Sequence, residues 1–253
     1  MDEQRRNHYL KMMGLTVWQR RGQLLPAENG ISVEGVAESP ASVIQGVADQ
    51  PLSADKDSFS TEDLAIPRYD WQSLKQQVRQ CQACTLRAGC TQTVFGVGNP
   101  QADLLVIGEA PGADEDKQGE PFVGRAGQLL NAMLLAMGFK REAVFIANIV
   151  KCRPPNNRDP KPEEASCCEP YLLQQVEFIQ PKLILAVGRI AAQNLLKSDI
   201  AVGKLRGRIH PFGAQKIPLV VTYHPAYLLR SPEQKRKAWQ DLQLALSVLG
   251  NPS

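Results

Sequence analysis

The sequence predicts a three-layer α/β/α fold with a central four-stranded parallel sheet, preceded by a disordered N-terminal extension. Four strand-like runs lie at residues 103–108, 144–150, 182–187 and 217–223, and the first three are nearly continuous in Leu, Ile, Val and Ala. Such runs are typical of strands buried on both faces. Helix-like stretches separate them, and this alternation is typical of a parallel sheet between two helical layers.

The predicted helices follow in chain order. One helix precedes the first strand, three connect successive strands, and the last follows the fourth strand and carries apolar residues on one face. They lie at residues 71–78, 127–137, 162–179, 190–196 and 232–249.

Two N-terminal segments differ from the globular body at residues 67–253. Residues 26–66 are rich in acidic residues and contain one aromatic residue, Phe59, so they bury too little apolar surface to fold, and we interpret them as a disordered linker. Residues 1–25 are basic and apolar, and we interpret them as a short amphipathic docking segment. Within residues 5–25, the stretch 9–21 resembles the N-terminal segment of the ψ subunit of bacterial DNA polymerase III, which docks on the clamp loader. A helix packed on the body is the alternative.

Charge is unevenly distributed along the chain. The formal net charge is +3 overall, and the linker holds eight acidic residues against one lysine, so the body is basic. A basic body suits a polyanionic partner, although an ordinary solvated surface also explains it. No apolar run is long enough to span a membrane, and no signal-peptide core follows the N-terminus. We therefore expect a cytoplasmic protein, in which cysteines serve more often as metal ligands than as disulfides.

Cysteine spacing predicts a metal centre. Cys81 and Cys84 lie within one turn, Cys152 follows the second strand-like run, and Cys168 lies in a predicted helix. Four such thiolates suit a tetrahedral zinc ion or an iron–sulfur cluster. The plainer alternative is a set of unrelated buried thiols, since free cysteine is among the most buried residue types.

Polar side chains gather in the loops that follow the predicted strands. In parallel sheets, ligands bind outside the carboxyl ends of the strands. Those loops hold carboxylates, an amide, arginines and a histidine, which we expect to form one site. The segments are residues 108–116, 148–158 and 223–230.

These loop motifs resemble those of the family 4 uracil-DNA glycosylases. The matching segments are Gly108-Glu109-Ala110-Pro111-Gly112, Gly119 to Gly124, Asn148 to Pro155 and His224-Pro225-Ala226. The resemblance covers roughly residues 71–249 and implies an enzyme of base excision repair that hydrolyses the N-glycosidic bond of uracil. No lysine stands out in a pocket loop as a Schiff-base nucleophile, so we expect a monofunctional enzyme. The resemblance further implies a [4Fe–4S] cluster held by Cys81, Cys84, Cys152 and Cys168. Cys167 is the alternative to Cys168, and Cys90 has no role in the pattern.

The resemblance, together with the chemistry of uracil release, implies roles for individual residues. Phe122 suits stacking on the flipped base. A single carboxamide, that of Asn148, can pair with O4 and N3 of uracil, and His224 can donate to the O2 atom that gains charge. Glu109 is the first candidate to orient the attacking water and Glu115 the second. The remaining substrate-binding candidates are Ala110 and Gly112.

The loop from His224 to Arg230 is expected to enter DNA. Leu228 is the candidate wedge that fills the gap left by the flipped base. Arg153, Arg158 and Arg230 are candidates for phosphate contacts, although each also suits a solvated surface. We expect a monomer acting on single- or double-stranded DNA. The alternatives are a non-catalytic iron–sulfur module that binds nucleic acid and a zinc-bound structural module.

Overall fold

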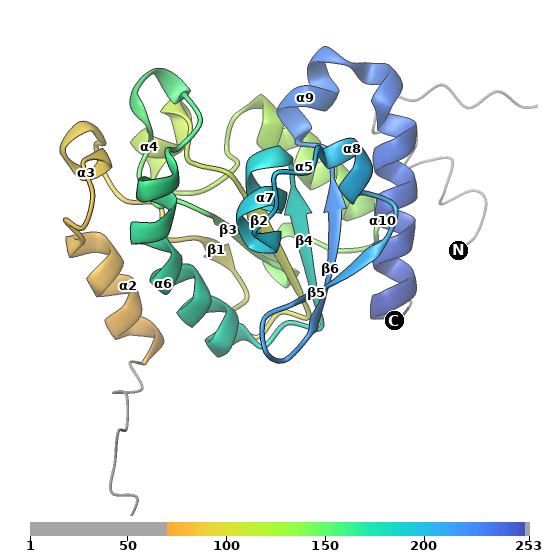
Figure 1. The fold of residues 1–253 in the computed structure, drawn as a ribbon, viewed down its shortest axis with the longest axis horizontal. Helices are drawn as coiled ribbons and strands as arrows, with labels where there is room; N and C mark the ends of the chain where they lie inside the picture. Colours follow the sequence, from red (N-terminus) through yellow and green to blue (C-terminus); the bar gives the residue numbers. More distant parts are fainter. Residues whose placement is uncertain (1–69, 251–253) are drawn as a thin grey trace, which may run out of the picture. The chain divides into compact units, whose positions relative to one another are not determined.

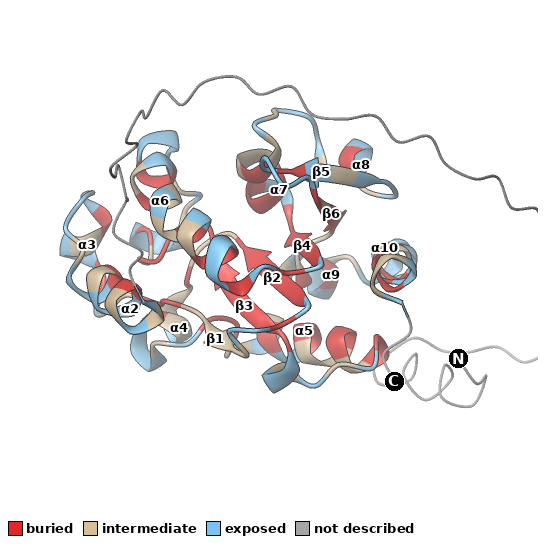
Figure 2. Ribbon diagram, turned by 90° about the horizontal axis from the view of Figure 1, so that it is seen from below, coloured by how far each residue is buried: buried red, intermediate tan, exposed pale blue. Residues whose placement is uncertain are grey.

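The computed structural model describes residues 70–250 (Figure 1). The predicted docking segment, residues 1–25, and the predicted linker, residues 26–66, lie outside these residues, so both interpretations stay predictions. The described body is a central sheet covered by helices on both faces, as the sequence predicts (Figure 2). No helix among the described residues is long and apolar enough to cross a membrane.

The sheet has six strands in the order β1-β3-β2-β4-β6-β5. The four predicted strands form its parallel centre, and two edge strands that were not predicted pair antiparallel, β1 with β3 and β5 with β6. β1 has two residues, and β5 is largely exposed and contains a proline, so neither shows an apolar run. The strands are β1 Val97–Gly98, β2 Leu104–Gly108, β3 Phe145–Asn148, β4 Leu183–Val187, β5 Ile209–Phe212 and β6 Ile217–Thr222.

The five predicted helices are present, with ends within three residues of those expected. Among the described residues, four short helices and two 3-10 turns lie outside the predicted helices, because so few residues show no helical period, and a third 3-10 turn, η3, forms the start of the helix predicted at residues 232–249. The predicted helices are α2 Trp71–Gln80, α5 Arg125–Ala136, α6 Pro162–Ile179, α7 Arg189–Leu196 and α10 Lys235–Leu249. The others are α3 Leu86–Gly89, α4 Ala113–Gln118, α8 Val202–Leu205, α9 Pro225–Arg230, η1 Arg141–Ala143, η2 Pro155–Asn157 and η3 Pro232–Gln234.

Alternate residues of each central strand serve two separate cores. In β2, Leu105 and Ile107 join the cluster that packs α2, α6 and α7, while Leu104 and Val106 join the cluster that packs α5 and α10. Side chains of a strand alternate between its faces, so a continuous apolar run builds both layers at once.

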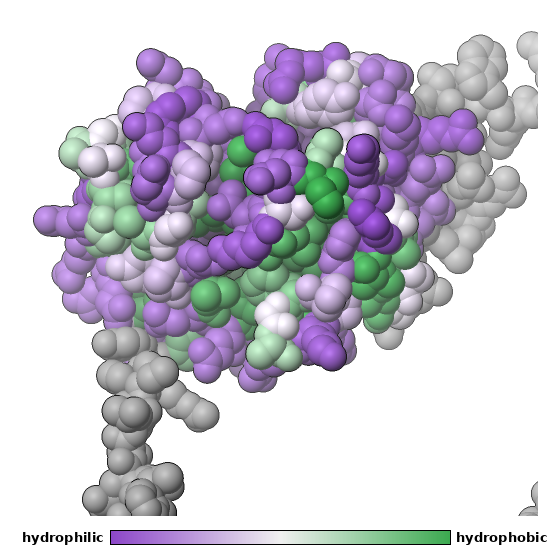
Figure 3. Space-filling view, viewed as in Figure 1, coloured by the Kyte–Doolittle hydropathy of each residue, from purple (hydrophilic) through white to green (hydrophobic). Residues whose placement is uncertain are grey.

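The carboxyl ends of the parallel strands meet at one edge of the sheet. Gly108 of β2 pairs in register with Asn148 of β3, and Val187 of β4 pairs with Thr222 of β6. The loops that leave these four positions carry the chemically reactive residues. Figure 3 shows hydrophilic side chains on both sides of a notch at the upper edge of the molecule, where Figure 1 shows the strands ending.

Candidate active site and cysteine cluster

A pocket of about 830 Å³ opens at the carboxyl ends of the strands. It is lined from the carboxyl ends of four strands, which contribute Glu109 after β2, Asn148 at the end of β3, Gly188 after β4 and His224 after β6. The structure therefore brings together the three predicted segments that follow strands. Ala110, Gly112, Glu115 and Phe122, which the sequence also predicts as site residues, line the same pocket.

Asn148 presents an unpaired amide to this pocket. The residue is 1% exposed, and neither Nδ2 nor Oδ1 has a hydrogen-bond partner among the described residues. Buried amides are normally paired, so this one fits a ligand that supplies both a donor and an acceptor. Gly108 leaves the required space, because a Cβ there would lie 2.5 Å from Oδ1 of Asn148.

Phe122 holds its ring beside the amide in a backbone conformation that aromatic residues rarely adopt. Its φ is +54°, and a Cβ on Gly108 would lie 2.6 Å from Cζ of Phe122. A left-handed bulky residue is an outlier that often marks a functional site. Gly127 makes the turn possible, since a Cβ there would lie 1.8 Å from the carbonyl oxygen of Phe122. The unusual backbone conformation therefore supports a functional role for the aromatic ring of Phe122, which lines the pocket.

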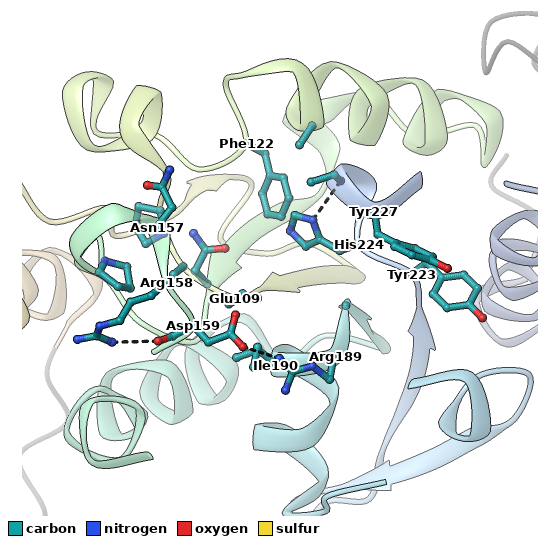
Figure 4. A pocket seen from close by; sticks show the side chains of 18 of the residues that line it. Glu109, Phe122, Asn157, Arg158, Asp159, Arg189, Ile190, Tyr223, His224 and Tyr227 are labelled. Carbon is teal, nitrogen blue, oxygen red and sulfur yellow. Dashed lines mark hydrogen bonds and ion pairs between the residues drawn. The ribbon is translucent and has the colours of Figure 1, made fainter. Parts of the chain in front are cut away.

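His224 lies beside Phe122, with the two ring centroids 5.6 Å apart (Figure 4). The residue caps α9, and its Nδ1 accepts the backbone N–H of Ala226 at 3.1 Å. Burial, reinforced by the charge of Arg230, lowers the pKa of His224 to about 4. The imidazole is therefore neutral at pH 7, and because Nδ1 accepts a hydrogen bond, Nε2 carries the proton.

Glu109 forms part of a charged group on the other side of the pocket. Burial raises the pKa of Glu109 to about 7, with a further contribution from the neighbouring carboxylate of Asp159 and an opposing one from Arg189. Asp159 is itself ion-paired with Arg189 of α7 (Figure 4). Glu109 is thus partly ionised at neutral pH, as suits a group that orients water.

Glu115 uses its carboxylate to hold two loops of the pocket together. It accepts backbone N–H bonds from Gly112 at 3.0 Å, from Val123 at 3.0 Å and from Gly124 at 3.3 Å. These bonds connect the loop after β2 to the loop that carries Phe122. Glu115 therefore cross-links the two loops through hydrogen bonds to their backbone.

The prediction for Leu228 is wrong. Leu228 is 1% exposed and belongs to the core between α5 and α10, because the helix α9 turns it inward. Its neighbour Leu229 is 37% exposed on the same helix. The sequence shows two adjacent leucines, and only the rotation of α9 distinguishes them.

The predicted arginines differ in whether their side chains already have hydrogen-bond partners in the protein. Arg158 makes two bonds to the carboxylate of Glu164, at 2.8 and 2.7 Å, and Arg153 donates to Oδ1 of Asn157 at 2.7 Å. Arg230 is exposed and lines the pocket. Asn157, Tyr223 and Tyr227 also line the pocket; they lie in the predicted segments but were given no role of their own. Asp159, Arg189 and Ile190 line it from outside those segments and were not predicted.

A second, smaller cavity is lined by the four cysteines predicted as ligands. Cys81, Cys84, Cys152 and Cys168 all line it, and none forms a disulfide. The backbone N–H of Lys151 donates to Sγ of Cys168 at 3.2 Å, and that of Ala83 donates to Sγ of Cys81 at 3.5 Å. Backbone donors to sulfur are typical around metal-bound thiolates.

The remaining two cysteines lie differently. Cys167 also lines the cavity, whereas Cys90 is buried just outside it, where its carbonyl accepts a bond from Arg87. Within residues 70–250, no three His, Cys, Asp or Glu side chains come close enough to hold one metal ion. Burial raises the pKa values of Cys84, Cys152 and Cys168. A raised pKa keeps these thiols neutral at pH 7, and a bound cation would favour their ionised form.

Comparisons with known proteins agree with this architecture. The family model described as "Uracil DNA glycosylase superfamily" matches residues 95–243. The chain is 42% identical over 174 residues to the type-4 uracil-DNA glycosylase of Archaeoglobus fulgidus, covering 66% of this chain and 87% of that protein. It is 43% identical over 180 residues to the type-4 enzyme of Thermotoga maritima, covering 70% of this chain and 93% of that protein. The chain therefore belongs to the uracil DNA glycosylase superfamily and, within it, to the type-4 uracil-DNA glycosylases.

Proposed function

We propose that this protein removes uracil from DNA by hydrolysing the N-glycosidic bond, and leaves an abasic site for base excision repair. The observation that carries the proposal is the buried, unpaired carboxamide of Asn148 in the pocket that also holds Phe122 and a neutral His224. A base inside a duplex cannot reach this pocket, so the nucleotide must flip out of the stack.

Base recognition follows from the amide. The Nδ2 group of Asn148 donates to O4 of uracil while its Oδ1 accepts from N3, and the ring of Phe122 stacks on the base. Cytosine presents a donor and a bare nitrogen at these positions. Both amide atoms would then stay buried without partners, at a cost of several kcal/mol.

The chemical step places positive charge on the sugar and negative charge on the departing base, mainly at O2. The Nε2–H of His224 donates to that oxygen. This neutral N–H group stabilises the anion through a hydrogen bond and keeps its proton, as a donor of an oxyanion hole does. The low pKa of His224 keeps the ring in this form at physiological pH.

Water then attacks the sugar, and Glu109 orients it. The Glu109 carboxylate lines the pocket, and its pKa of about 7 leaves much of it ionised in neutral solution. Glu115 is the second candidate, but its oxygens already accept three backbone N–H bonds. Its contribution is to hold the two loops at the distance that the base requires. The main-chain segment at Ala110 and Gly112 forms the neighbouring wall.

The surface around the pocket suits a DNA strand. Arg230 is the foremost candidate for a phosphate contact, followed by Arg153 and Arg158, whose side chains already have protein partners. Leu229 replaces Leu228 as the apolar side chain able to enter the gap left by the flipped base.

The cofactor that we propose is a [4Fe–4S] cluster bound by Cys81, Cys84, Cys152 and Cys168. Each thiolate of such a cluster binds its own iron, so the four sulfurs need not converge on one point as they do around zinc. The free thiols around one cavity and the backbone N–H bonds to two of them support this assignment. When bound, the cluster supplies cross-links between α2, the loop after β3 and α6.

The chain organisation and partners extend the proposal. We infer that residues 67–253 form the catalytic domain and that the protein acts as a monomer in the cytoplasm. Residues 5–25 dock on a replication protein of the clamp-loader type, with residues 26–66 as a flexible tether.

The decisive experiment compares two oligonucleotides that differ only in one base. The purified protein is incubated with uracil-containing DNA and with matched thymine-containing DNA, and the products are cleaved with alkali. Cleavage of the uracil strand alone supports the proposal. Stable binding to both strands without any cleavage contradicts it and favours a non-catalytic binding module.

A further inference from the structure

Lys151 is the largest side chain that the described fold buries completely. It lies just after β3, is 1% exposed, and has no carboxylate partner in an ion pair within residues 70–250. Its Nζ donates to two neutral oxygens, the backbone carbonyl of Asn148 at 2.9 Å and Oε1 of Gln175 at 2.6 Å. Hydrogen bonds to neutral groups do not replace a counter-charge, so burial of this ammonium calls for a nearby anion.

Gln175 is too well held to be an accidental neighbour. It is fully buried in α6, and its Nε2 donates to the carbonyl oxygen of Phe95 at 2.9 Å. Its amide is therefore oriented with the oxygen toward Nζ of Lys151. The fold prepares a polar site for the lysine and still provides no negative charge.

The cysteine cavity lies directly beside this lysine. Lys151 lines that cavity, its backbone N–H donates to Sγ of Cys168, and Cys152 follows it in the chain. An iron–sulfur cluster held by four thiolates has a net negative charge, because the thiolates outweigh the positive core. Such a cluster supplies the missing anion.

We propose that Lys151 is the internal counter-charge of the cysteine-bound cluster and, through its bond to the Asn148 carbonyl, the residue that positions the base-reading amide. The inference rests on the proposed function and extends it. Lys151 touches neither substrate nor reacting atoms, so it is a positioning residue.

The positioning effect follows from what holds Asn148. Its side chain has no hydrogen-bond partner among the described residues, so the backbone at the end of β3 sets the direction of the amide. Just beyond it, Ile149 donates to the carbonyl of Gly108 at 2.9 Å, and the Lys151 ammonium fixes the carbonyl of Asn148 itself. Loss of the lysine leaves this carbonyl free to tilt, and the amide moves with it.

The test uses the holoenzyme with Lys151→Met, which keeps the shape of the side chain and removes its charge. We expect a retained cluster, a reduction potential shifted to more negative values, and single-turnover uracil release slowed about 10-fold or more with unchanged DNA affinity. The control is Lys182→Met, which removes an exposed lysine paired with Asp103 and should change neither the reduction potential nor the rate of uracil release. A Lys151→Met enzyme with the parental potential and rate overturns the inference.

A second variant covers the case in which Lys151→Met does not fold. Gln175→Glu has the same shape and places a carboxylate against Nζ of Lys151, so the lysine no longer compensates the cluster. We expect a more negative reduction potential in this variant, and an unchanged potential overturns the inference. A parent protein that is brown and releases uracil, combined with variants that show no shift, rejects this inference alone. A parent protein without visible absorbance rejects the proposed cofactor instead.

Discussion

Glu115 and Asp116 are neighbours in α4, and their carboxylates bind two different parts of the molecule. Glu115 accepts the N–H groups of the pocket loops, at Gly112, Val123 and Gly124. Asp116 is buried and accepts both the N–H and the hydroxyl of Thr91, at 2.8 Å each, just after Cys90. The short helix α4 thus connects the pocket loops to the segment that follows Cys90.

Substitution of the four proposed cysteine ligands tests the assignment of the cluster. Ser at Cys81, Cys84, Cys152 or Cys168 should each remove visible absorbance and lower soluble yield, because ligation stabilises the surrounding loops. Cys90→Ser should be mild, since Cys90 does not line the cavity. Absorbance spectra and yield provide the measurement. If Cys167→Ser bleaches the protein and Cys168→Ser does not, Cys167 is the ligand.

Removal of the histidine donor should impair chemistry more than binding. His224→Ala should slow uracil release by about 10²–10³-fold while DNA binding persists, because it removes one donor to the departing base. His210→Ala is the matched control, since His210 bonds to the carbonyl of Leu205 and does not line the pocket. Single-turnover rates and binding titrations measure both effects. Unchanged turnover in His224→Ala removes this residue from the mechanism.

Exchange of the amide should change base selectivity. Asn148→Asp should weaken uracil release and narrow the margin over cytosine, because an ionised carboxylate cannot donate to O4 but can accept from the amino group of cytosine. Asn99→Asp is a suitable control, because Oδ1 of Asn99 only accepts a bond from Gln101. Excision rates on uracil and cytosine strands give the ratio. The parental uracil rate in Asn148→Asp would contradict the edge-reading role.

The ionisation of Glu109 predicts the pH dependence. Its pKa of about 7 means that acid protonates the group that orients water, so the single-turnover rate should fall below about pH 7. His224, with a pKa of about 4, stays neutral across this range and adds no second change in the rate with pH. Glu109→Gln should be slow, and its rate should no longer fall as the pH is lowered.

Asp159→Asn removes the negative charge beside Glu109, so the fall in rate should move to lower pH, while Arg189 still favours ionised Glu109.

A control separates this effect from general surface charge. Asp103→Asn removes an exposed carboxylate paired with Lys182, at the start of the sheet and away from the pocket lining. Its pH profile should match that of the parent. A fall in rate near pH 7 that persists in Glu109→Gln would show that another group controls the rate.

Deletion of residues 1–25 tests the docking proposal, which concerns residues outside the described structure. The truncated protein should keep its activity on naked oligonucleotides and lose co-purification with replication proteins, because the proposal assigns docking to residues 1–25 and catalysis to residues 67–253. Activity assays, pull-downs and thermal melting check this. A lower melting temperature together with lower activity would show that the segment belongs to the fold.

The sequence by itself determined the layered fold and the edge of the sheet where the site lies. Strands buried on both faces need nearly continuous apolar runs, so residues 103–108, 144–150 and 182–187 could be identified from the sequence, and the strand-like run at 217–223 completed the set. Loop motifs then indicated the pocket, and cysteine spacing indicated the residues that line the second cavity. The edge strands β1 and β5 were not predicted, because a short or exposed strand is defined by its pairing with a neighbouring strand and not by an apolar pattern of its own.

Only the tertiary structure decided which side chains are available and what charges surround them. The rotation of α9 buries Leu228 and exposes Leu229, although the two are indistinguishable in the sequence. Asp159 approaches Glu109 from a loop fifty residues away and helps to raise its pKa. Lys151 reads as one more basic residue beside a cysteine until the fold encloses it. Burial and charge proximity arise from packing between distant segments, and local patterns carry no record of that packing.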